Sequence, residues 1–267
     1  MDRASAPFGR LLRQWRTQRG RSQLALALLA EVSARHLSWL ETGKAQPSRA
    51  MVLRLAEQLD VPLRERNALL LAAGYAPMYA ERSLADPALA PARAVLQRLL
   101  DAHEPAPALA VDRHWQLVAH NRLVPLLLSA AAPELLLPPV NVLRVSLHPR
   151  GLAPQVANLP AWRAHVLARL QRQLAATGDA VLAALLAELQ ALPSPAGSGD
   201  EAAPAPLSDV AVPLTLHGPL GTMNFITTIT VFGAPHDVTV SELAVETLLP
   251  ADEDTAAALR AMHAALG

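Results

Sequence analysis

The stretch from Ser22 to Ser48 constrains the fold most, because it contains two short helical segments separated by only three residues. Ser22 can cap a first helix that extends to Ala30, and Ser33 can cap a second helix that Gly43 ends. Helices this short are unstable alone and gain most of their stability from packing. The stretch therefore predicts a compact helical unit.

The flanking sequence extends this unit to five helices within residues 1–75. Apolar residues recur at helical spacing over residues 8–19, Pro47 and Ser48 open a fourth helix, and Pro62 lies near the start of a fifth that runs to Gly74. Residues 1–75 carry 12 Arg and Lys against 6 Asp and Glu, and residues 76–267 carry 11 against 17. A basic unit of this kind can bind a polyanion. A basic face that is merely solvated is the alternative.

The two central helices have the proportions of a helix-turn-helix, in which the second helix enters the major groove of DNA. Ala27 is small enough for the helices to cross closely, and residues 31–33 form the turn. Leu37 and Leu40, three residues apart, pack inward. The residues left on or near the outward face are Ala34, Arg35, Ser38 and Trp39.

Several short motifs occur together at the spacing of a known family, namely Ser22-Gln23, Val32-Ser33, Leu40-Glu41-Thr42-Gly43-Lys44 and Pro47-Ser48. With these motifs the stretch resembles the λ-repressor-like, or XRE-type, helix-turn-helix. The resemblance covers about a quarter of the chain and implies a sequence-specific, DNA-binding transcription regulator. The residues expected to contact DNA are Ser22, Gln23, Ser33, Ala34, Arg35, Ser38, Trp39, Lys44 and Arg49.

Roles within this set follow residue by residue. Arg35 is the expected base reader, through a bidentate contact with guanine, and a contact with phosphate alone is the alternative. The resemblance assigns Gln23, Lys44 and Arg49 to phosphates. Glu41 is expected to bond within the domain, because phosphates would repel its carboxylate.

Two residues depart from the family pattern. Glu31 occupies a turn position that is usually Gly, because the backbone there tends towards positive φ. Trp39 stands where the family often has a polar base reader. Trp39 either touches a thymine methyl group or sugar, or covers the packing between the helices.

The remainder of the chain predicts a connector and an α+β unit. Residues 76–107 form the connector, with one helix over residues 92–103. Residues 108–267 combine short strands at 108–119, helices at 121–132, 160–176 and 180–192, alternating strands at 210–216, 222–232 and 243–249, and a closing helix. Residues 217–221 have hairpin-turn chemistry, and residues 193–206 are a low-complexity loop expected to be mobile. The predicted fold class is multi-domain, an all-α five-helix domain followed by an α+β domain with an antiparallel sheet.

Residues 141–179 and 232–260 resemble the ligand-binding domain of MmyB-type transcription regulators. The resemblance implies a PAS-like domain, in which helices over one face of an antiparallel sheet enclose a pocket. It further implies a bacterial regulator whose domain senses a fatty acid or a related apolar small molecule, without any other cofactor.

The candidate ligand-binding residues combine apolar and cationic side chains: Trp115, Arg144, Trp162, Arg163, His165, Phe225 and Ile229. Arg144, Arg163 and His165 could anchor a carboxylate. Alternatively, the aromatic members belong to the core and Arg163 lies on a helix surface. The domain is also expected to dimerise, so that two recognition helices meet a palindromic operator. A protein-interaction or dimerisation module without a small-molecule ligand is the second hypothesis.

Other classes of function find little support. The chain has no Cys, which excludes disulfides and thiolate metal sites. The nine His lack metal-ligand spacing, and neither a nucleophile elbow nor a phosphate-binding loop occurs. We therefore expect no metal and no enzymatic activity, and an enzyme fused to a DNA-binding domain is the weakest reading. No apolar run reaches the roughly 18 residues of a membrane span, and the N-terminus lacks a signal-peptide core, so a cytoplasmic protein is expected.

Overall fold

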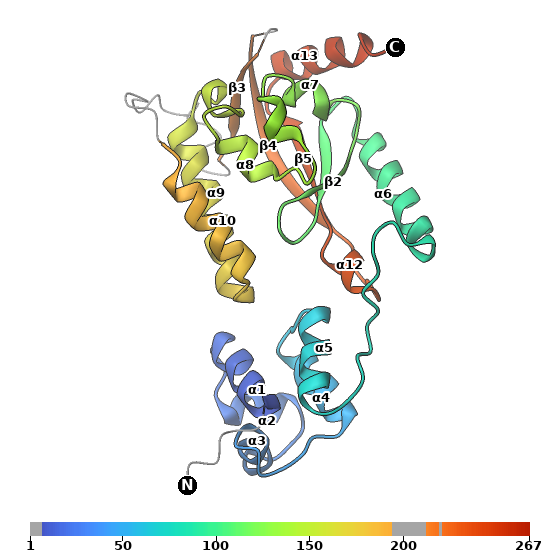
Figure 1. Cartoon of the computed structure of the whole chain (residues 1–267), viewed down its shortest axis with the longest axis vertical. Helices are drawn as coiled ribbons and strands as arrows, with labels where there is room; N and C mark the ends of the chain where they lie inside the picture. The colour runs from blue at the N-terminus through green and yellow to red at the C-terminus, as the bar shows by residue number, and fades with distance from the viewer. Residues whose placement is uncertain (1–6, 194–211, 219–220) are drawn as a thin grey trace. The chain divides into compact units, whose positions relative to one another are not determined.

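The computed structural model describes residues 7–193, 212–218 and 221–267 (Figure 1). The chain folds into two compact units. The first contains the N-terminal helices up to Ser83 together with Ala234–Ser241. The second contains Leu84–Gly233 and Glu242–Gly267. The segment Ala234–Ser241 is thus an addition to the N-terminal unit that no local sequence pattern indicates.

Five consecutive helices form the N-terminal part of the first unit within the described residues, as the sequence predicts. They are α1 (Pro7–Gln18), α2 (Gln23–Leu29), α3 (Ala34–Glu41), α4 (Arg49–Gln58) and α5 (Leu63–Ala72). Ser22, Ser33 and Ser48 are N-caps whose hydroxyl oxygens accept the amide hydrogen three residues later, at 3.0, 3.1 and 3.2 Å. These caps satisfy amide groups that the first helical turn leaves unpaired.

The core of the first unit lies between these helices. Phe8, Leu12 and Trp15 of α1 are buried, and so are Leu37 and Leu40 of α3. Other buried members are Leu26, Ala27, Val52, Leu55, Ala56, Leu69 and Leu70. The inward positions of Leu37 and Leu40 confirm the predicted orientation of the second short helix.

The segment Ala234–Ser241 is held to the N-terminal unit by backbone and side-chain bonds. Its short helix α12 (Val238–Ser241) begins with a fully buried Val238, whose amide donates to the carbonyl of Ala80 at 2.8 Å. The Oδ1 atom of Asp237 accepts the amide of Thr239 at 2.9 Å, and its Oδ2 atom accepts Nη1 of Arg82 at 3.0 Å. The Thr239 hydroxyl donates to the Arg82 carbonyl at 2.6 Å.

Among the described residues, the predicted helices and strands of the second unit occur in the predicted order, together with an unpredicted helix over Val142–Leu147 and three unpredicted 3-10 helices. Its helices are η1 (Pro87–Leu89), α6 (Ala90–Ala102), α7 (Val124–Leu128), η2 (Pro133–Leu136), α8 (Val142–Leu147), η3 (Ala153–Gln155), α9 (Leu159–Thr177), α10 (Ala180–Ala191) and α13 (Glu253–Ala264). Its strands are β1 (Ala108–Val111), β2 (Leu117–His120), β3 (Leu214–Gly218), β4 (Gly221–Val231) and β5 (Ala244–Pro250). The predicted helix over residues 121–132 is too long, because only the five residues of α7 are α-helical.

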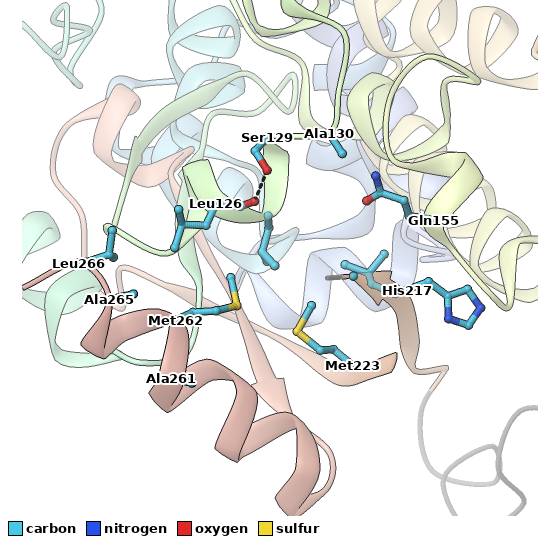
Figure 2. A pocket seen from close by; sticks show the side chains of 13 residues that line it. Leu126, Ser129, Ala130, Gln155, His217, Met223, Ala261, Met262, Ala265 and Leu266 are labelled. Carbon is cyan, nitrogen blue, oxygen red and sulfur yellow. Dashed lines mark hydrogen bonds between the residues drawn. The ribbon is translucent and has the colours of Figure 1, made fainter. Parts of the chain in front are cut away.

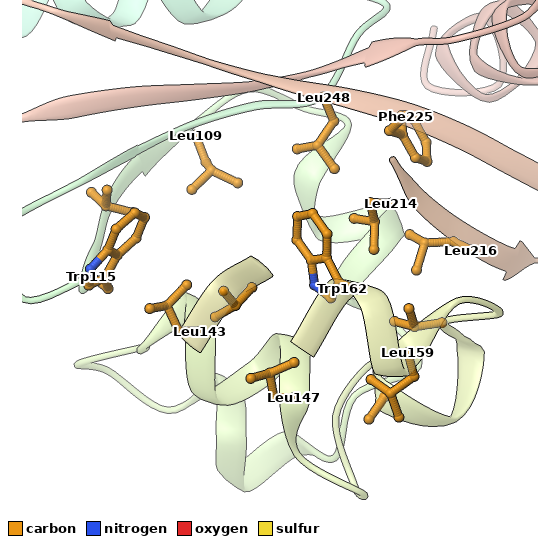
Figure 3. Packing of buried hydrophobic residues seen from close by; sticks show 14 of the residues in the cluster. Leu109, Trp115, Leu143, Leu147, Leu159, Trp162, Leu214, Leu216, Phe225 and Leu248 are labelled. Atoms are coloured by element: carbon orange, nitrogen blue, oxygen red, sulfur yellow. The ribbon is translucent and has the colours of Figure 1, made fainter. Parts of the chain in front are cut away.

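Within the described residues, these strands form one antiparallel sheet of five, in the order β2-β1-β5-β4-β3. One face carries Ala108, Ala110 and Val245 and packs against Leu96 and Leu100 of α6. The opposite face packs against α8 and α9 (Figure 3). Residues that meet there include Leu109, Leu214, Leu248 and Phe225 from the sheet and Leu143, Leu147 and Trp162 from the helices. The predicted fold class, an all-helical domain followed by an α+β domain with an antiparallel sheet, is confirmed.

The long strand β4 is buried around Met223 and Phe225 and exposed towards its C-terminal end. Met223 and Phe225 are 4% and 0% exposed, whereas Ile229 and Val231 further along the same face are 47% and 62% exposed. The expected apolar residues of β4 therefore do lie on one face of the strand. However, that face is buried only over part of its length. Val210, residues 194–206 of the expected loop, and the turn at residues 219–220 lie outside the described residues.

Candidate functional site

The outward face of α3 carries the predicted base reader. Arg35 is exposed, and its guanidinium lies 4.6 Å from the centroid of the Trp39 ring, within the range of a cation–π contact. Trp39 is itself 38% exposed. Ala34 and Ser38 are half-buried on the flanks of this pair. The helix therefore presents a flat aromatic and cationic surface.

The turn before α3 has the conformation expected from the sequence. Glu31 has φ of 54°, the left-handed region in which Gly is usual. The amide of Val32 donates to the carbonyl of Ala27 at 2.9 Å, which closes the turn onto α2. Glu31 thus adopts the left-handed conformation usual for Gly at this position, and the turn keeps its expected geometry.

A buried ionic cluster fixes α3 against α1 and α2. Glu41 is 4% exposed and accepts Nε and Nη2 of Arg16 at 2.5 and 3.0 Å. The Nε2 atom of Gln23 donates to the same carboxylate at 2.7 Å. This bonding raises the pKa of Arg16, chiefly through its hydrogen bond to Glu41. Glu41 thus bonds within the domain as expected, and it also holds the side chain of Gln23 that was expected at a phosphate.

The remaining predicted DNA contacts lie near the ends of the helices. Ser22 and Ser33 are exposed N-caps of α2 and α3. Lys44 is exposed between α3 and α4, and Arg49 is the exposed first residue of α4. Helix N-termini and cations at these positions are suited to phosphate groups.

A small inner cavity of about 80 Å³ lies between the covered face of the sheet and its helices. Its walls are mainly Leu and Val, with Trp162 of α9 and Ser146 of α8. The indole Nε1 atom of Trp162 donates to the Ser146 hydroxyl at 2.9 Å. The charged members of its described lining are Arg169 of α9 and Glu246 of β5, joined at 3.0 Å.

Arg169 and Glu246 are charged cavity residues that the sequence did not predict. The guanidinium of Arg169 lies 4.2 Å from the centroid of the Trp115 ring, and its side chain is 17% exposed. Trp115 has φ of 66° and donates from Nε1 to Oε1 of Gln173 at 2.8 Å. A left-handed Trp is costly and persists only where its surroundings hold it. Within the sequence Arg169 is one of several Arg along α9, so periodicity alone does not distinguish it.

A larger outer cavity of about 700 Å³ lies at the end of the sheet near α13 (Figure 2). It is lined by apolar residues of α7, β3, β4 and α13, among them Leu126, Met223 and Met262, with Ser129, Gln155 and His217 as polar members. None of its described lining residues is Arg, Lys, Asp or Glu. Leu127 of α7 and Leu216 of β3 line both cavities and therefore stand between them.

The cationic residues expected to anchor a carboxylate lie outside the described linings of both cavities. Arg144 pairs with Glu188 at 2.5 Å and lowers the pKa of that carboxyl. Arg163 donates from Nη2 to the carbonyls of Leu189 and Gln190 at 3.0 and 2.9 Å, at the end of α10. His165 stacks on Trp162, and burial lowers its pKa. These residues are occupied in helix packing.

The other candidate ligand residues lie in different places: in a cavity lining, in the core or on the surface. Trp162 lines the inner cavity, while Trp115 stands behind Arg169. Phe225 is fully buried in the core and outside both linings. Ile229 lies on the exposed part of β4 and outside the described linings of both cavities.

Comparison with known families decides what kind of protein carries these features. Residues 92–262 match the family model described as MmyB-like transcription regulator ligand binding domain. The chain is a member of the MmyB-like transcription regulator family. Residues 7–69 of this MmyB-like regulator match a helix-turn-helix domain. It is thus a DNA-binding transcription regulator with a ligand-binding domain, and both matched domains are regulator domains rather than enzymes.

Solved structures with similarity to this MmyB-like regulator include the restriction-modification controller protein C.AhdI from Aeromonas hydrophila. The identity is 36% over 23% of this chain and 92% of that chain, with a TM-score of 0.22. An RNA-binding light-oxygen-voltage receptor is 14% identical over 98% of this chain and 64% of that chain, with a TM-score of 0.28. No curated relative matches the chain. Among residues 7–193, 212–218 and 221–267, no helix is long and apolar enough to cross a membrane, and no group of metal-binding side chains occurs.

Proposed function

We propose that this MmyB-like regulator is a cytoplasmic homodimer that binds a palindromic operator and responds to an apolar carboxylic acid such as a fatty acid. The observation that carries the DNA-reading part is the exposed pair of Arg35 and Trp39 on the capped helix α3. A bidentate contact between Arg and guanine contributes about 1–3 kcal/mol of discrimination against other bases. Ser22, Lys44 and Arg49 would set the register through phosphates.

The ligand part of the proposal is supported by the two cavities. Ligand sites are mainly apolar, with a small number of polar groups that orient the ligand. Here Arg169 is the cationic residue of the described, mainly apolar lining of the inner cavity. Its guanidinium has five N–H donors, one of which bonds Glu246. A carboxylate can bond further donors of the same guanidinium, while its acyl chain lies against the leucines. The proposal requires no cofactor besides this ligand.

Regulation requires that the ligand bind one state of the protein more tightly than the other. Thr227 of β4 and Glu246 of β5 line the inner cavity, and the segment that joins these two strands, Ala234–Ser241, is bonded into the N-terminal unit. A ligand that shifts β4 or β5 would act on the helices through this segment. We propose this covalent route as the link between ligand and DNA.

A binding-site selection from random duplexes, run with the purified full-length protein, tests the DNA part. We expect an inverted repeat whose half-sites lie one helical turn, or a multiple of it, apart. A collection of unrelated sequences would contradict the proposal. Native mass spectrometry of freshly purified protein tests the ligand part. A co-purified carboxylic acid supports the sensor, and an apo mass with no binding of added tetradecanoic acid supports an interaction module instead.

A further inference from the structure

The residues between the two cavities of the ligand-binding domain indicate which ligand lengths the domain can accept. This inference rests on the proposed function. The inner cavity of about 80 Å³ is far smaller than the roughly 300–1,000 Å³ of ordinary ligand sites. The outer cavity of about 700 Å³ is large enough, but none of its described lining residues is Arg, Lys, Asp or Glu. Neither cavity alone is therefore suited to a long amphiphilic acid.

Together the cavities can accommodate both ends of such a ligand, the carboxylate in the inner cavity and the acyl chain in the outer one. Ile229 and Met223 lie six residues apart on β4, and they pair with Glu246 and Leu216 respectively. At about 3.3 Å per residue, this places the charged end roughly 20 Å from the row of Leu216. One acyl chain occupies half of the roughly 30 Å hydrocarbon core of a bilayer, or about 15 Å. Because about 20 Å exceeds about 15 Å, an acid whose carboxylate lies at Arg169 reaches the row of Leu216 only when its acyl chain is longer than that and extended.

The side chains of Leu127 and Leu216 stand where such a chain must pass. Leu216 is 3% exposed, and Leu127 is packed against the same apolar cluster. Beyond them, Met223 and Met262 face the outer cavity (Figure 2). Methionine side chains are flexible and adapt to irregular apolar shapes. The outer wall is therefore suited to chains of more than one length.

We propose that Leu127 and Leu216 are specificity-determining residues that set ligand length. Acids with a short chain remain on the Arg169 side of these leucines, whereas the tail of a long acid passes between them into the outer cavity and contacts α13. The orientation of the ligand follows from charge, since Arg169 belongs to the described inner lining and the described outer lining contains neither Arg nor Lys.

Calorimetric titration with octanoic, tetradecanoic and octadecanoic acids tests the inference. The sample is the full-length protein, in the oligomeric state in which it purifies, after bound lipid has been removed. We expect wild-type affinity to rise with chain length, because each added methylene is buried. Leu216→Trp closes the passage and should weaken octadecanoic acid at least tenfold while changing octanoic acid less than threefold. Met262→Trp fills the outer cavity from a half-buried position and should give the same selective loss if Leu216→Trp fails to fold.

Leu137→Trp is the matched control, because Leu137 is 66% exposed and outside both linings. Equal affinities of wild type and both test variants for all three acids would overturn the inference while leaving the ligand class intact. A wild-type protein that binds none of the acids would instead overturn the proposed ligand class and the inference with it. An equal loss for octanoic and octadecanoic acids in folded variants would also overturn the length-setting role.

Discussion

The guanidinium of Arg35 lies over the indole of Trp39 one helical turn away, with 4.6 Å between the guanidinium carbon and the ring centroid. Both side chains are on the exposed face of α3, so the stack restrains the long Arg side chain before it meets DNA. Preorganisation of this kind reduces the entropy lost on binding. The contact with Arg35 is a role for Trp39 that neither alternative included, and both of those alternatives stay predictions.

Arg35→Ala should weaken operator binding by about 1–3 kcal/mol and relax the sequence preference at the base that Arg35 reads. Fluorescence anisotropy with the selected operator and a scrambled duplex, at one salt concentration, measures both effects. Arg13→Ala is a charge-matched control at an exposed position of α1. If Arg35→Ala and Arg13→Ala reduced the affinity for both duplexes equally, Arg35 would be a phosphate contact and not a base reader.

Glu41→Ala should destabilise the helix-turn-helix by about 3–5 kcal/mol, because it leaves the buried guanidinium of Arg16 without its partner. Urea unfolding followed by circular dichroism measures the change in free energy. Glu57→Ala, at an exposed position of α4, is the control and should change it by less than about 0.5 kcal/mol. Equal midpoints for the two variants would show that the ion pair contributes little.

Gly9→Ala should destabilise the same unit by about 1–3 kcal/mol, because an added Cβ would lie 2.5 Å from the carbonyl oxygen of Glu41. That oxygen belongs to the backbone and can yield only if α1 and α3 separate. Gly233→Ala, where a Cβ has no heavy atom within 4 Å, is the matched control. Thermal unfolding of both variants checks the prediction, and an unchanged melting temperature for Gly9→Ala would contradict it.

Asp237→Asn should reduce the effect of ligand on operator affinity. The substitution weakens the bond to Arg82 while an oxygen remains to cap α12, so the segment between β4 and β5 is held less firmly. The measurement is the ratio of operator dissociation constants with and without tetradecanoic acid, together with the ligand affinity itself. Arg260→Gln, which breaks the exposed pair with Glu253, is the control. A wild-type ratio in Asp237→Asn would contradict the proposed route.

Acid should remove the contribution of Glu104 to stability. Hydrogen bonds from Arg122, supported by His263, lower the pKa of Glu104 from 4.5 to about 2. A carboxyl whose pKa is lowered by folding stabilises the native state fully above its unfolded pKa, and this contribution is lost as the pH falls from about 4.5 towards 2. The free energy of unfolding of wild type should exceed that of Glu104→Gln at pH 6, and the difference should shrink by pH 3. A pH-independent difference in urea midpoints would contradict this assignment.

Much of the fold was predictable because its signals are local. Caps at Ser22, Ser33 and Ser48 act within three residues, and the positive φ at Glu31 follows from the turn between two short helices. Alternation likewise identified β4, although it could not show that the far end of the strand, at Ile229, is exposed. The helix predicted over residues 121–132 was too long, because apolar content alone does not distinguish a helix from a packed loop.

The sequence by itself determined the helix-turn-helix, the antiparallel class of the sheet and the outward position of Arg35, because each depends on neighbours within a few residues. Only the tertiary structure decided that Arg169, and not Arg144 or Arg163, lines the cavity, since its partner Glu246 is 77 residues away. The bond between Arg82 and Asp237 spans 155 residues in the same way. Such pairs form only when chain folding brings distant segments together, and no local periodicity carries that information.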